Sequence, residues 1–186
     1  ARPDQLAQWE ALGSLRQSGQ LCDVLLRSAD GETLVAHAVV LAVASEKLSQ
    51  QLQGKKKPID IPVEASAAAI RAALDFVYGG TANVAASVVP DLVRIACRWD
   101  LRLLQQTLTV ELEEHLTPEI VAGLFALREP FGERLGAAAR SSVLANLSTC
   151  MRTEAFGRWP SQFLKHVLRS DDLFVESEEE ALLAVA

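Results

Sequence analysis

The chain has 186 residues, of which 49% are hydrophobic and 23% charged, and its 18 basic against 24 acidic residues give a formal net charge of −6. This length allows one large domain or two small ones with a buried core, and the composition excludes a disordered chain, a fibrous repeat and a disulfide-dense miniprotein. The acidic balance argues against sequence-independent binding to nucleic acid, because such binding needs a broad cationic surface that displaces counterions.

The chain opens with a helical pattern and continues with a hairpin signal. The opening segment carries apolar residues at near-helical spacing and predicts a helix that ends by Gly19. These apolar residues are Leu6, Trp9, Leu12 and Leu15. Residues 22–27 and 32–35 are two short apolar runs on either side of an Asp-Gly pair at Asp30, which predicts a β-hairpin.

The next segment predicts one helix and one further strand. Residues 37–52 are apolar and rich in alanine and valine, so they predict a single buried helix that stops at Gly54. A lysine-rich connection follows over residues 55–58. Residues 59–63 alternate in polarity and predict a short strand, held at a sheet edge by Pro62.

The remaining sequence is almost wholly helical in pattern. A proline at the first helical position after Thr117 marks one helix start, and a capping box at residues 177–180 marks another. That last helix is cut off at Ala186, so we expect the chain to be a fragment of a longer protein. The apolar stripes or helical stretches lie at residues 70–77, 92–99, 104–112, 120–127, 133–147 and 161–168. The pattern predicts a mixed α+β first half and an all-helical second half.

The sequence contains no pattern typical of catalysis, of a cofactor or of a metal. Its three histidines, His37, His115 and His166, have no zinc-site spacing, and no nucleophile elbow or phosphate-binding loop is present. The acidic residues 178–180 occupy a predicted helix N-terminus, where negative charge complements the helix dipole. We therefore expect a protein that is not an enzyme and has no cofactor, no metal site and no catalytic residue.

Cysteine usage and hydropathy predict the compartment. Cys22, Cys97 and Cys150 are odd in number and far apart, which indicates thiols in a reducing compartment, and Cys150 is the better candidate for a redox sensor because Arg152 follows it. No apolar run approaches the ~20 residues of a membrane span, and the N-terminus lacks the order of a signal peptide. We expect a cytoplasmic protein without membrane or nucleic-acid partners. Lys55–Lys57 is interpreted as a solvated loop in preference to an import or phosphate-contacting patch, and a nuclear location in addition stays open.

Four segments carry a resemblance to a known family. Residues 21–26 (LCDVLL) and 36–45 (AHAVVLAVAS) resemble the BTB/POZ domain, in which a CDV-x-L strand precedes an A-H-x-x-V-L-A-x-x-S corner. Residues 75–80 (DFVYGG) resemble the F-x-Y-[TG]-G helix end of that family, and residues 91–101 (DLVRIACRWDL) its outgoing helix. Residues 163–178 (FLKHVLRSDDLFVESE) resemble the BACK domain, so the ordered set resembles Kelch-like BTB-BACK proteins.

The resemblance implies the fold and a self-association surface. It implies an α+β BTB/POZ domain over residues 1–115, with helices around a small mixed sheet, and an all-α BACK domain of helical hairpins over residues 116–186, truncated at its C-terminus. In BTB proteins the first helix packs on a second subunit, so a two-fold homodimer is implied. The positions carried over to that interface are Leu6, Trp9, Leu12 and Asp23. At the strand-to-helix corner we expect His37 to be buried and hydrogen-bonded to backbone.

The same resemblance implies a function. Kelch-like BTB-BACK proteins typically act as non-catalytic substrate adaptors of cullin-3 RING ubiquitin ligases, in which the BTB half dimerises and binds cullin-3. A C-terminal Kelch propeller holds the substrate protein, and because no Kelch motif occurs here, the substrate would bind through a domain absent from this chain. The candidate cullin contacts are Leu48, Leu52 and Tyr78.

Two positions depart from the family pattern. The family's hydrophobic-x-Glu cullin motif is replaced by Leu52-x-Gly54, and the connection there is a few residues short. Losing a charge-assisted hydrogen bond of about 1.5–3 kcal/mol would weaken cullin binding tenfold or more. Ala38 stands where the family has a basic residue, so we expect Asp23 to lack its partner and the dimer to be weaker.

Three functional hypotheses follow. The first is a cullin-3 adaptor, and the second is a dimerisation scaffold that has lost cullin-3 binding. The third is a transcriptional regulator that uses the BTB domain as a dimeric platform, which Lys55–Lys57 favours and the BACK half disfavours.

Overall fold

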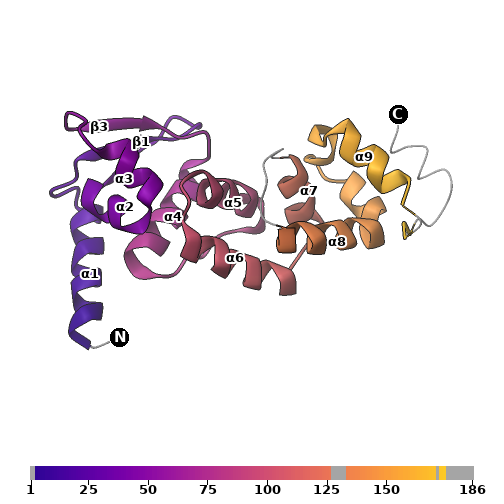
Figure 1. The fold of residues 1–186 in the computed structure, drawn as a ribbon, viewed down its shortest axis with the longest axis horizontal. Helices are drawn as coiled ribbons and strands as arrows, with labels where there is room; N and C mark the ends of the chain where they lie inside the picture. The colour runs from indigo at the N-terminus through magenta and orange to yellow at the C-terminus, as the bar shows by residue number, and fades with distance from the viewer. Residues whose placement is uncertain (1–2, 127–132, 171, 175–186) are drawn as a thin grey trace. The chain divides into compact units, whose positions relative to one another are not determined.

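The computed structural model describes residues 3–126, 133–170 and 172–174, and the chain divides into two compact units, residues 1–105 and 106–186 (Figure 1). Each unit is treated by itself. None of the helices within the described ranges is both long enough and apolar enough to cross a membrane.

The first unit contains a three-stranded sheet of order β2-β1-β3. The central strand β1 (Val24–Arg27) pairs antiparallel with β2 (Thr33–Ala36) and parallel with β3 (Ile59–Pro62). The turn between β1 and β2 includes Gly31 at a φ of 86°, a left-handed conformation that glycine adopts without strain. The sequence-based prediction of a hairpin and a third strand is confirmed.

The position of Pro62 follows from the chemistry of its backbone. It is the last residue of β3, which lies at an edge of the sheet. Proline has no N–H, so it fits at an edge strand where no ladder bond is lost. The prediction that this strand lies at a sheet edge is confirmed.

The helices of the first unit surround a central helix, α4 (Ala67–Gly79), which packs against α1 (Pro3–Gln17), α2 (Ala38–Ala44), α5 (Val89–Arg98) and β2. The Oγ of Ser66 accepts a hydrogen bond from the Ala69 N–H at 3.4 Å and caps the start of α4. Gly80 ends α4 at a φ of 76°, and its N–H donates to the Phe76 carbonyl at 2.7 Å. The side chains of Ile70 and Leu74 on α4 are fully buried in the core.

The prediction of one helix over residues 37–52 is wrong, because the segment forms two helices. The first is α2, and α3 (Glu46–Leu52) follows directly after Ser45, whose φ of −150° and ψ of 126° are extended. The Ser45 Oγ accepts a hydrogen bond from the Leu48 N–H at 3.2 Å and donates to the Trp99 carbonyl oxygen. Serine therefore works here as an N-cap that is also tied to a distant helix end.

Helix α6 (Arg102–Glu114) leads from the first unit into the second, whose described residues contain helices joined by turns and loops, with no strand among them. Its helices are α7 (Pro118–Ala126), α8 (Glu133–Met151) and α9 (Ser161–Leu168). They enclose an aromatic and aliphatic core that includes Val121, Val143 and Trp159. The predicted capping box at residues 177–180 and the helix after it lie outside the described residues.

Aromatic packing joins α7 and α9 in the second unit. The rings of Phe125 and Phe163 stack with their centroids 3.9 Å apart, and Trp159 meets both rings edge-on. The Trp159 Nε1–H donates to the Ala122 carbonyl at 2.8 Å, which gives the buried indole its hydrogen-bond partner.

Candidate functional site

The corner between β2 and α2 is organised by a buried histidine. The backbone N–H of His37 donates to the Tyr78 hydroxyl oxygen at 2.9 Å, and the His37 Nδ1 lies 2.7 Å from the same oxygen. The His37 Nε2 lies 2.9 Å from the Gln20 carbonyl oxygen. A carbonyl oxygen only accepts, so Nε2 donates to it and, in the neutral ring, Nδ1 accepts from the tyrosine hydroxyl. The prediction of a buried histidine bonded to backbone is confirmed.

An arginine at the end of α1 joins this corner to α4. Arg16 is almost fully buried, forms an ion pair with Asp75 of α4, and holds its guanidinium carbon 5.2 Å from the centre of the Tyr78 ring. That distance is within the range of a cation–π contact. The last turn of α1 is therefore fixed to its own domain, and the side chains further towards the N-terminus lie beyond this anchor.

Asp23, which immediately precedes β1, has two partners from different parts of the chain. Its Oδ1 accepts a hydrogen bond from the Ala38 N–H at 2.6 Å, and its Oδ2 forms an ion pair with the Lys57 ammonium. Burial opposes ionisation of this carboxyl, but Lys57 and the Ala38 N–H together outweigh that effect and lower the pKa of Asp23. The expectation that Asp23 lacks a basic partner is wrong, because the lysine comes from the connection between α3 and β3.

An exposed apolar face on α2 was not predicted from the sequence. The side chains of Val39 and Val43 are 68% and 74% exposed, and residues four apart lie on one face of a helix. Leu21, two residues before Asp23, is also highly exposed. A signal was present, because α2 reads AVVLAVA and a seven-residue helix without a polar residue has an apolar surface on every side.

The predicted dimer residues differ in their surroundings. Trp9 is exposed on α1, Leu12 is half-buried on the same helix, and Asp23 lies in the ion pair described above. Leu6 also lies on α1, but its side chain falls outside the described residues. The structure thus brings Asp23 next to the start of α2 and leaves Trp9 open to solvent.

The three predicted cullin contacts are core residues. Leu48, Leu52 and Tyr78 are 1%, 6% and 3% exposed, respectively, and Tyr78 uses its hydroxyl on His37. The exposed residues of the same helix, α3, are polar. They are Glu46, Lys47, Gln50 and Gln51. Contact with cullin-3 through the three buried side chains stays a prediction.

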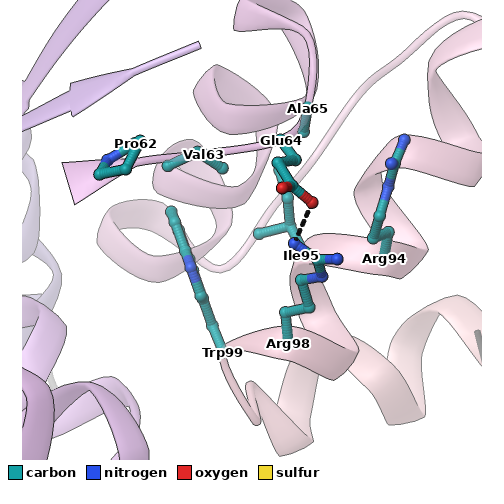
Figure 2. A pocket seen from close by; sticks show the side chains of 8 residues that line it. All are labelled: Pro62, Val63, Glu64, Ala65, Arg94, Ile95, Arg98 and Trp99. Carbon is teal, nitrogen blue, oxygen red and sulfur yellow. Dashed lines mark hydrogen bonds and ion pairs between the residues drawn. The ribbon is translucent and has the colours of Figure 1, made fainter. Parts of the chain in front are cut away.

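A small hollow lies between the end of β3 and α5 (Figure 2). Trp99 and Val63 line it, and the Arg98 guanidinium forms an ion pair with Glu64 at 2.7 Å. The volume of about 50 Å³ has room for one or two water molecules. Pockets that hold organic ligands are several times larger, so this hollow does not accommodate a substrate.

The structure also bears on a redox-sensing thiol and on a metal site. The thiol of Cys150 is fully buried, and burial, with a smaller effect of Glu119, raises its pKa to about 11. A redox-sensing cysteine needs a lowered pKa and exposure, so the prediction of a sensor at this position is wrong. Among the residues that the structure describes, His, Cys, Asp and Glu side chains form no group of three able to hold a metal ion.

Comparison with known proteins assigns both halves of the chain. Residues 12–116 match the BTB/POZ domain family, and residues 129–186 match the family described as BTB And C-terminal Kelch. The chain is 28% identical to Kelch-like protein 28 of Mus musculus and to that of Homo sapiens, over 187 aligned positions in each case. Each alignment covers 98% of this chain and 32% of the relative, so the chain spans about a third of the length of these curated relatives.

A solved structure shares the fold of part of the chain. The BTB domain of zebrafish PATZ1 matches with a TM-score of 0.54 at 24% sequence identity. The match covers 61% of this chain and 95% of the zebrafish domain. This likeness supports the fold alone.

Proposed function

Because the chain belongs to the BTB/POZ family and carries a BACK domain behind it, we propose that it is a non-catalytic protein-interaction module of the cullin-3 adaptor type. The ordered pair of domain matches is the observation that carries the proposal. The BACK match favours an adaptor over a transcriptional regulator, because the BTB transcription factors usually lack that domain. A recruited substrate protein, held by a domain outside this chain, belongs to the same proposal.

Self-association is the first part of this function. The exposed face of Val39 and Val43 on α2 and the exposed Trp9 on α1 are apolar surfaces of the kind that a second copy of the chain covers. We expect a two-fold homodimer in which these surfaces are buried. Light scattering should then give twice the chain mass of 20.1 kDa.

A matched pair of variants tests the surface. Val43→Asp places a carboxylate in the proposed contact and should weaken the dimer at least about tenfold, because an unpaired charge is costly to bury. Val110→Asp changes another exposed valine, on α6, and should leave the dimer unchanged. A wild-type chain that stays monomeric at all accessible concentrations would contradict the proposal.

Cullin-3 binding is the second part and has its own test. Calorimetric titration of the chain with the N-terminal domain of cullin-3 should give saturable binding at low micromolar concentration or below. Absence of heat at tens of micromolar would remove the adaptor function. The dimer test above would then decide whether a scaffold remains.

A dimeric scaffold without cullin-3 binding is the second candidate function. The observation that favours it is the segment after Leu52, where Gly54 and three lysines stand in place of an acid. The burial of Leu48, Leu52 and Tyr78 supports the same candidate, because those side chains offer a partner almost no exposed surface.

A further inference from the structure

We propose that Lys57 is a positioning residue for self-association, because it is the counter-ion that lets an ionised Asp23 lie beside an apolar contact surface. This inference rests on the proposed homodimer and names the residue that controls its strength. Lys57 acts through Asp23 and is not itself required as part of the apolar contact.

The geometry places Lys57 at a junction of three chain segments. Asp23 leads into β1, Ala38 begins α2, and Lys57 belongs to the connection between α3 and β3. One carboxylate oxygen of Asp23 accepts the Ala38 N–H, and the other pairs with the Lys57 ammonium. The ion pair therefore joins the lysine connection to the first residue of α2.

Two exposed apolar residues border this junction, and Val39 belongs to the proposed contact surface. Val39 directly follows Ala38, and Leu21 precedes Asp23 by two residues; both side chains are mostly exposed. A second copy that covers these residues also takes water away from Asp23, whose side chain is 23% exposed in the single chain. Removing water from a carboxylate is unfavourable unless a cation compensates it.

Lys57 is the cation in position to do this. Its side chain is 62% exposed, so the ammonium lies at the surface and can remain next to Asp23 when that surface is covered. The pKa of Asp23 is lowered, which is the direction expected of a carboxyl that keeps its charge. With alanine at position 38, the side chain of that residue supplies no charge to the site.

The test compares dimer dissociation constants by sedimentation velocity at neutral pH. Lys57→Met should weaken the dimer about three- to tenfold, the range for a partly exposed pair that becomes more buried on association. Lys55→Met removes another exposed lysine from the same connection and should leave the dissociation constant within about twofold of wild type. Thermal unfolding followed by circular dichroism verifies that each variant is folded.

Two rescue variants separate charge compensation from a structural defect. Asp23→Asn combined with Lys57→Met keeps the acceptor for the Ala38 N–H but removes the charge that needs compensation, so dimerisation should recover. Ala38→Lys combined with Lys57→Met supplies a new cation next to Asp23 and should also restore it.

The outcomes are distinct. A dimeric wild type with an unaffected Lys57→Met variant overturns this inference and leaves the dimer standing. Failure of both double variants to recover also overturns it, because the defect would then come from something other than the charge of Asp23. A wild-type chain that never dimerises overturns the proposed homodimer together with this inference.

Discussion

Replacing Tyr78 with phenylalanine removes one oxygen atom from the buried corner of the first unit. That oxygen accepts the His37 N–H at 2.9 Å and lies 2.7 Å from the His37 Nδ1. The variant therefore leaves a buried backbone donor and a buried ring nitrogen without a partner. Each such loss costs about 1–3 kcal/mol, and the two together are expected to lower the free energy of unfolding by about 2–6 kcal/mol.

Urea unfolding followed by circular dichroism measures this change, and Thr81→Val is the control because it removes a hydroxyl from an exposed residue. The control should alter stability by less than about 0.5 kcal/mol. If Tyr78→Phe is as stable as the control, the hydrogen bonds at His37 do not hold the corner together. If Tyr78 served only to contact cullin-3, the Tyr78→Phe variant would be as stable as the control. The experiment therefore separates a structural role of Tyr78 at the corner from a role in cullin-3 contact.

Three further predictions concern single groups. The pKa of Asp23 is lowered in the folded chain, so its ionised form stabilises the fold at pH values above its ordinary pKa of 3.8. That stabilisation is lost as the pH falls through the lower pKa of the folded state. In urea unfolding, the stability advantage of wild type over Asp23→Asn should therefore shrink below about pH 4. Cys150 should resist maleimide at pH 7.5 in the folded chain and react only in denaturant, because its pKa is about 11 and its thiol is buried; equal labelling rates by mass spectrometry would contradict this. Trp159→Phe should destabilise the second unit by about 1–3 kcal/mol, because the hydrogen bond from the indole N–H to the Ala122 carbonyl is lost. Trp9→Phe, at an exposed site, is the control and should not destabilise the chain. Urea unfolding measures both variants.

The elements that were predicted correctly depend on signals within a few residues. The hairpin follows from the Asp-Gly pair at Asp30, and the end of α4 follows from the left-handed Gly80. The start of α7 at Pro118 is equally local. In each case the residue that sets the backbone lies at the turn or helix end itself.

The features that were missed depend on partners far away in the sequence. The break between α2 and α3 needs Ser45, whose hydroxyl bonds the Trp99 carbonyl 54 residues later. The partner of Asp23 was sought at the neighbouring position 38, whereas Lys57 lies beyond two helices. The hydroxyl of the buried Tyr78 finds its partner in His37, 41 residues away. Periodicity and capping rules carry no information on such pairs.

The connection between α3 and β3 is where the two proposed interactions meet. In this chain it contains no acid after Leu52, and the same short stretch brings Lys57 to Asp23. A longer connection that restored an acid for cullin-3 would also shift Lys57 along the chain. We expect that shift to break the ion pair between Lys57 and Asp23. Cullin binding and self-association therefore place different demands on one segment. On this reasoning, we expect Lys57 to strengthen the dimer and the missing acid to weaken cullin-3 binding.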